Sequence, residues 1–165
     1  MKTFLTALVM GLCGALAVFV SFSMGWATWV MFLAWVSYYL FGKSIKVYIP
    51  SFLQIIAGIV MGVLIQSISG LLVPAIGALG FPVTVFVLIG SLAYVSKING
   101  LNNIPAWFLG LIIFFGVHPE LQVIPVLELL VPIVAGVVFA LINDTGLKYI
   151  NSITHIKNKN EHIRK

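Results

Sequence analysis

The stretch AGIVMGVLIQSISGL at residues 57–71 and the stretch AGVVFALINDTGL at residues 135–147 have the same order of residue types. Each begins with Ala-Gly and continues through aliphatic residues to an amide, Gln66 in the first and Asn143 in the second. A hydroxyl residue and then Gly-Leu close both stretches. The chain therefore contains two copies of the same apolar helix ending. The segments around these copies decide the fold.

The composition indicates an integral membrane protein. Of the 165 residues, 61% are hydrophobic and 8% are charged, which is too little polar surface for a water-soluble globule. A soluble catalytic domain is excluded, and no metal-ligand spacing, phosphate loop or nucleophile elbow is present, so we expect no enzyme, no cofactor and no metal. The formal net charge of +5 would suggest nucleic acid for a soluble protein. Here membrane orientation explains it better, and we expect the lipid bilayer, not nucleic acid, as the partner.

Apolar runs separated by Gly, Pro, Asn or Lys predict six transmembrane helices, each of about 20 residues or fewer. They lie at Thr3–Phe22, Trp26–Phe41, Val47–Ile68, Pro82–Ser96, Ile104–Val117 and Val123–Ile142. All nine Lys and Arg residues then fall on one face of the membrane, and the opposite loops have none. The positive-inside rule places both termini in the cytoplasm. We expect one six-helix domain, residues 1–150, and a basic cytoplasmic tail, residues 151–165.

The doubled helix ending extends into a repeat, because its flanking segments match at separations of roughly 75 to 78 residues. The matched pairs are TALVMG (6–11) with TVFVLIG (84–90), VSFSMG (20–25) with VSKING (95–100), and WVMFLAWVSYYLFG (29–42) with WFLGLIIFFG (107–116). Each half, about 1–72 and 80–148, has three spans, so the two copies enter the membrane from opposite faces. The sequence predicts an all-α inverted 3+3 repeat, an architecture common among channels and transporters.

The second and fifth spans are short, and short spans at corresponding positions point to the central site of such proteins. These two spans also hold most of the aromatic rings, and polar residues inside the other spans are scarce. The candidates for lining a pathway are Trp35, Tyr38, Tyr39, Gln54, Gln66, Trp107, Phe108, Glu128 and Asn143. The alternative is that the aromatic rings face lipid and the amides join helices by hydrogen bonds.

Glu128 is the carboxylate that falls within a predicted span, where an ionised group costs about 2.5–3.5 kcal/mol on insertion scales. It either lines an outer vestibule with His118 and Glu120, or couples transport to a proton or cation. No Lys or Arg lies within any predicted span. The interior therefore suits a small neutral or cationic solute better than an anion.

The early Gly-rich segment, WATWVMFLAWVSYYLFG (26–42), IPAWFLGLIIFFG (104–116) and AGVVFALINDTGL (135–147) resemble the YcdZ-like family of small bacterial inner-membrane proteins. The resemblance extends over about residues 3–149 and its motifs are soft, without a catalytic signature. The family is a domain of unknown function. The resemblance implies a multi-pass protein of the bacterial inner (cytoplasmic) membrane and supplies no active residues.

Three functions remain open at this point. The leading hypothesis is a channel or facilitator for a small neutral solute, expected to be a homo-oligomer because so small a bundle exposes Gly-rich and aromatic faces. The second is a small secondary transporter coupled through Glu128. The third, from a different class, is a membrane scaffold or subunit that transports nothing.

Overall fold

The computed structural model describes the backbone of residues 2–163 and the side chains of residues 2–153, and the regular elements of this part are all helical. They are α1 (Lys2–Ser23), α2 (Thr28–Leu40), α3 (Ile45–Ile76), the short 3₁₀-helix η1 (Gly77–Leu79), α4 (Gly80–Val95), α5 (Ile104–Val117), α6 (Val123–Glu128) and α7 (Leu130–Ile163). Each predicted apolar span falls on a helix. The expected all-helical architecture is confirmed.

The helices differ in whether they are long enough to cross a membrane. Three apolar stretches are long enough by length and composition: Lys2–Ser23, Ile45–Val95 and Val123–Ile153. The apolar helices α2 and α5 are shorter, with 13 and 14 residues. At a rise of about 1.5 Å per residue, each extends about 20 Å, less than the roughly 30 Å of a hydrocarbon core. The prediction that these two helices are unusually short is confirmed.

Three helix boundaries differ from the prediction by more than two residues, and the largest difference is at α7, which continues to Ile163, 21 residues past the predicted end at Ile142. The last predicted span is interrupted at Leu129, whose N–H bonds the carbonyl of Val126, three residues back, at 3.3 Å. Pro132 explains the interruption, because a proline has no N–H for the carbonyl of Glu128 and its ring crowds that carbonyl. The third span continues eight residues past its predicted end, from Ile68 to Ile76. The apolar segment after it is therefore a helix extension followed by η1.

The chain divides into two compact units. Unit 1 is Met1–Tyr39 with Pro132–Lys165, and unit 2 is Leu40–Val131. Unit 1 therefore contains α1, α2 and nearly all of α7, and unit 2 contains α3 to α6. Each unit combines the first two helices of one predicted half with the third helix of the other.

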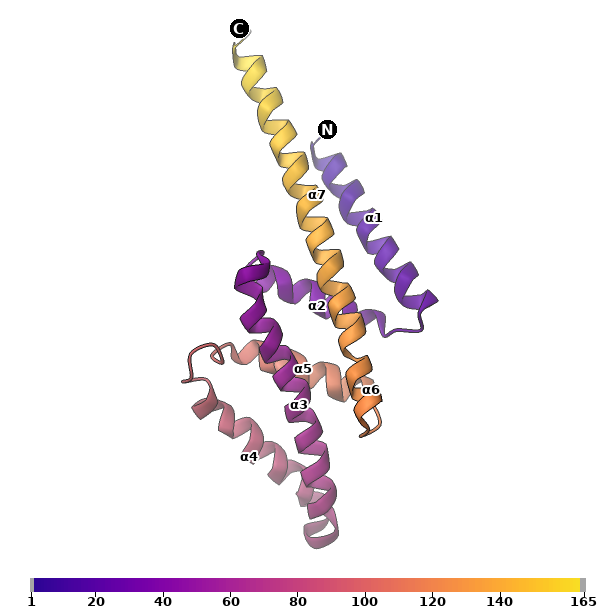
Figure 1. Ribbon diagram of the computed structural model, residues 1–165, viewed down its shortest axis with the longest axis vertical. Coiled ribbons are helices and arrows are strands. Elements are labelled where there is room, and N and C mark those ends of the chain that lie inside the picture. The colour runs from indigo at the N-terminus through magenta and orange to yellow at the C-terminus, as the bar shows by residue number, and fades with distance from the viewer. Residues whose placement is uncertain (1, 164–165) are drawn as a thin grey trace. The chain divides into compact units, whose positions relative to one another are not determined.

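Within each unit the long helix is covered by its neighbours. In unit 2, α3 packs against α4 and α5, and the chain reverses at η1 so that α4 runs back beside α3 (Figure 1). The buried apolar cluster of this unit consists of Met61, Ile65, Leu92, Trp107 and Leu111. In unit 1, α1 runs antiparallel to α7, with Val9 against Gly146 (Figure 1).

A close glycine contact between helices occurs in each unit, and unit 2 has a second one, where Gly110 on α5 lies against the backbone of α3 at Ile55. In unit 2, Gly58 on α3 lies against the backbone of α5 at Trp107, and in unit 1, Gly136 on α7 lies against the backbone of α2 at Met31. A Cβ atom added at either glycine would collide with the backbone carbonyl oxygen of that partner. Small residues permit such close approach of membrane helices. The Ala-Gly that opens both copies of the quoted stretch is thus the contact point of its helix.

Further along α2 and α5, each helix also has a pair of aromatic rings with similar geometry. Tyr38 and Tyr39 on α2 are T-shaped, with ring centroids 5.5 Å apart at 84°. Phe114 and Phe115 on α5 are T-shaped as well, at 5.2 Å and 83°. In both pairs the first ring is buried and the second is half-buried. The two helix pairs therefore share a close glycine contact and a T-shaped ring pair. The rings carry hydroxyl groups in unit 1 and none in unit 2.

Candidate functional site

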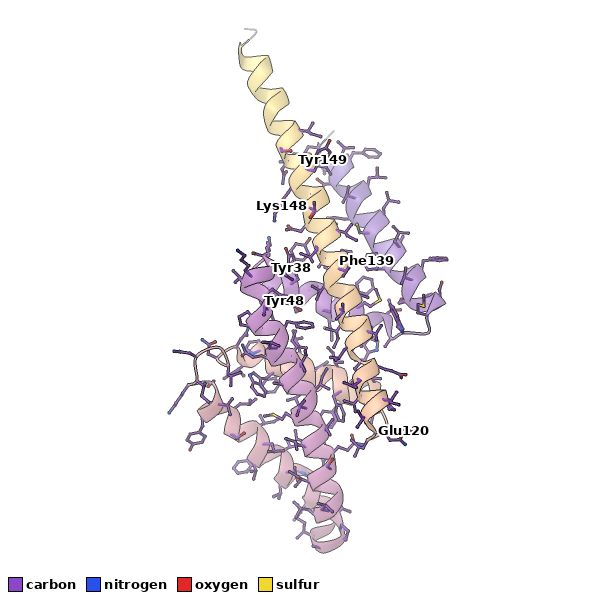
Figure 2. All side chains as sticks on the ribbon, viewed as in Figure 1. Tyr38, Tyr48, Glu120, Phe139, Lys148 and Tyr149 are labelled. Carbon is purple, nitrogen blue, oxygen red and sulfur yellow. The ribbon has the colours of Figure 1, made fainter. Side chains whose placement is uncertain are left out.

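A polar cluster lies between α2 and α7 in unit 1. The Tyr38 hydroxyl donates to Asp144 Oδ2 at 3.2 Å, and Asn143 Nδ2 donates to the Tyr39 hydroxyl at 2.7 Å. We call these four residues the tyrosine–amide cluster. Figure 2 labels Tyr38 on α2, with Phe139 and Lys148 on α7 before and after the cluster.

The helix period explains why these side chains meet. Gly136 seats α7 against α2 at Met31. Asn143 and Tyr38 each lie seven residues further along their own helix, which is about two turns, so each keeps the face that forms the contact. The glycine contact therefore positions the cluster.

The charge of Asp144 is balanced within the same helix. Asp144 is buried, and its Oδ2 lies 2.6 Å from Lys148 Nζ, one turn further along α7. The Lys148 side chain is exposed, which keeps its ammonium group in a polar environment. With one carboxylate and one ammonium group, the cluster and Lys148 together have no net charge.

Asn143 has one free polar atom. The side chain is 2% exposed, and its Oδ1 is the buried side-chain oxygen without a hydrogen-bond partner among the side chains that the structure describes. Leaving such an acceptor unpaired costs about 1–3 kcal/mol, so its presence requires an explanation. Tyr39, which holds the other end of the amide, is only half-buried, so the cluster reaches the surface of the unit at that ring.

Four of the predicted pathway residues come together in unit 1. Trp35 is half-buried on α2 and stacks on Phe139 of α7, with centroids 6.2 Å apart at 15°, one turn before Tyr38 and Tyr39. Asn143 completes the group. The site prediction omitted Asp144 and Lys148, although their spacing of four residues is the pattern of a helical ion pair and was a usable signal.

Two other predicted residues, Gln54 and Trp107 in unit 2, each bond the connection between α4 and α5. Gln54 Nε2 donates to the carbonyls of Pro50 and Gly100 at 3.1 and 2.8 Å, and Gln54 Oε1 accepts from the N–H of Asn103 at 2.7 Å. Trp107 Nε1 donates to the carbonyl of Leu101 at 3.2 Å. Both ends of the Gln54 amide are therefore partnered by the protein.

The remaining predicted residues lie outside these two clusters. Gln66 is half-buried on α3, and Phe108 is exposed on α5. Glu128 is exposed at the end of α6. His118 and Glu120, the expected vestibule residues, are exposed where α5 ends and in the loop that follows; Figure 2 labels Glu120 there. Of the expected tail, residues 151–165, the side chains beyond 153 are outside the described residues.

Long apolar helices indicate an all-helical protein of the membrane class. Within that class, the chain belongs to the family described as "Protein of unknown function (DUF1097)", whose model matches residues 7–146. A search of curated proteins and a search of solved structures found no match. The family match includes the whole tyrosine–amide cluster and ends just before Lys148.

Proposed function

We propose that this protein is a membrane channel or facilitator for a small uncharged solute and that the tyrosine–amide cluster lines its pathway. The observation that carries the proposal is the buried, unpartnered Oδ1 of Asn143. A polar solute that leaves water needs such acceptors, since an unpaired polar group in an apolar interior is costly. Because Asp144 is already paired with Lys148, the cluster offers no uncompensated charge to attract an ion.

We further propose an inverted 3+3 repeat of six spans with both termini in the cytoplasm. The matched contacts of Gly58 and Gly136 and the short helices α2 and α5 support this architecture. The one-sided distribution of Lys and Arg supports the orientation. The proposal includes a homo-oligomer in a bacterial inner membrane, in keeping with the YcdZ-like resemblance, and a function without enzymatic chemistry.

Solute flux tests the proposal directly. We expect proteoliposomes with the full chain to take up at least one of urea, ammonia, small polyols or small amides faster than protein-free vesicles, measured by stopped-flow light scattering or, for ammonia, by an internal pH dye. Asn143→Leu removes the acceptor, and since a hydrogen bond contributes about 1 kcal/mol, we expect its flux to fall by roughly fivefold. Folded protein without flux for any of these solutes would refute the facilitator and favour the scaffold.

A second candidate function, a proton- or cation-coupled transporter, is favoured by the position of Glu128. This exposed carboxylate lies at the interruption between α6 and α7, and interrupted helices hold coupling ions in many transporters. Coupling predicts that a pH or sodium gradient drives solute accumulation and that Glu128→Gln abolishes it. Uptake by Glu128→Gln that equals wild type and ignores both gradients excludes this candidate.

A further inference from the structure

We propose that the tyrosine–amide cluster is a binding site for a small neutral solute that donates hydrogen bonds, with Asn143 Oδ1 as the acceptor that recognises it. This inference rests on the proposed function for the role of the site and names the chemical class of its solute. The binding step can be measured without transport.

The hydrogen bonds of Asn143 determine whether the site offers a ligand a donor or an acceptor. Nδ2 is held by the Tyr39 hydroxyl at 2.7 Å, and this bond orients the amide. Oδ1 is then the atom left for a ligand, and it is buried without a partner. A carbonyl oxygen accepts hydrogen bonds and cannot donate them, so a neutral ligand must have an N–H or O–H group.

The charges around the amide exclude ions. Asp144 next to Asn143 repels an anion, and its carboxylate already has Tyr38 at 3.2 Å and Lys148 at 2.6 Å. A cation would have to compete with the Lys148 ammonium group for that carboxylate. A neutral donor meets neither obstacle and satisfies an acceptor that otherwise costs free energy.

The surroundings of the amide restrict size. Asn143 is almost completely buried, and the half-buried Tyr39 leads from the cluster to the surface. A side chain so enclosed leaves no room for a large ligand, so the proposed solute must have few non-hydrogen atoms. Urea, ammonia, primary amides and small alcohols have the required size and donors, whereas fully N-methylated amides lack the donors and are larger.

Saturation-transfer NMR tests the inference on the full chain in detergent micelles, with acetamide as the probe and N,N-dimethylacetamide as its donor-free counterpart. We expect a saturable acetamide signal and at least tenfold weaker binding of the dimethyl compound. We expect Asn143→Leu to weaken acetamide binding by about fivefold, the effect of losing one hydrogen bond. Thr145→Val is the control, because Thr145 is an exposed neighbour whose hydroxyl bonds Leu141 O on its own helix.

A second variant keeps the amide and removes its support. Tyr39→Phe deletes the hydroxyl that holds Nδ2, so we expect the preference for acetamide over its dimethyl analogue to shrink several-fold while circular dichroism stays unchanged. Equal binding of the two probes to wild type, or undiminished acetamide binding to folded Asn143→Leu, overturns the inference.

The two proposals fail in different ways. Donor-selective binding through Asn143 without flux in proteoliposomes overturns the facilitator and keeps the binding site. Flux that is insensitive to N-methylation and to Asn143→Leu overturns the binding site and keeps the facilitator.

Discussion

Two buried amides, Gln54 in unit 2 and Asn143 in unit 1, show how the same functional group is used differently in one chain. Gln54 is 1% exposed and Asn143 is 2% exposed, so burial does not distinguish them. Gln54 forms hydrogen bonds with both ends of its amide, to the backbone of Pro50, Gly100 and Asn103. Asn143 forms a hydrogen bond with Nδ2 only. The two amides have the same polar atoms and similar burial. A structural amide has partners for both its nitrogen and its oxygen, whereas a candidate binding amide has one of them without a partner.

The difference has an energetic side. A fully partnered buried amide contributes to stability through every bond it makes, while an unpartnered acceptor lowers stability by the cost of its desolvation. Natural proteins retain such costs chiefly where function requires them. We therefore expect opposite effects on stability when each amide is replaced by an apolar residue: a loss at Gln54, and no loss or a gain at Asn143.

The largest expected effect on stability comes from the glycine contacts that the two units share, at Gly58 and Gly136. Gly58→Ala and Gly136→Ala each place a Cβ atom on a backbone carbonyl oxygen, which moves only if a helix moves. We expect each variant to lose about 3 kcal/mol in the free energy of unfolding in detergent, at the upper end for overpacking. Gly11→Ala, where nothing lies within 4 Å of the added Cβ, is the control and changes stability by no more than about 1 kcal/mol. Markedly unequal losses at the two glycines would break the equivalence of the units.

A smaller loss is expected from Gln54→Leu. This variant leaves the Gly100 carbonyl and the Asn103 N–H without the amide that joins them. Hydrogen bonds in membrane proteins average about 0.6 kcal/mol, and unpaired backbone groups cost more, so we expect a loss of about 2 kcal/mol. Chemical unfolding followed by circular dichroism measures it. An unchanged unfolding midpoint would remove the structural role of Gln54.

The smallest effect, and the one of opposite tendency, is expected from Asn143→Leu. It deletes the bond to Tyr39 and also the unpaired Oδ1. These changes oppose each other, so we expect stability between that of wild type and a gain of about 1 kcal/mol. The same unfolding assay applies, without added solute. A loss as large as that of Gln54→Leu would show that Asn143 is a structural amide, and the contrast between the two units would disappear.

The helices were predictable because their signal is local. Long apolar runs bounded by Gly, Pro and Lys place the six segments without any knowledge of their partners. The errors also have local causes. Pro132 interrupts the last span, and α3 continues through its polar end, where the Ser69 hydroxyl bonds the carbonyl of Gln66, into the apolar residues that follow.

The partners of the polar residues were not predictable, because those contacts are distant along the chain. Tyr38 and Asp144 are 106 residues apart, and Gln54 and Asn103 are 49 residues apart. The repeat suggested halves of about 1–72 and 80–148, yet the compact units combine helices of both. Residue types indicated that Asn143 and Gln54 were candidates, and only their hydrogen bonds separated their roles.

The division of the chain between the units has a consequence for biosynthesis. Unit 2 is one uninterrupted segment, residues 40–131, and unit 1 joins the first 39 residues to the last 34. Chains are made from the N-terminus, so α1 and α2 must wait in the membrane until α7 has been synthesised, while all of unit 2 is already complete. The bond from Asn143 Nδ2 to the Tyr39 hydroxyl forms only after α7 has been made. A chain that ends before α7 therefore has the two tyrosines of the cluster without Asn143 and Asp144.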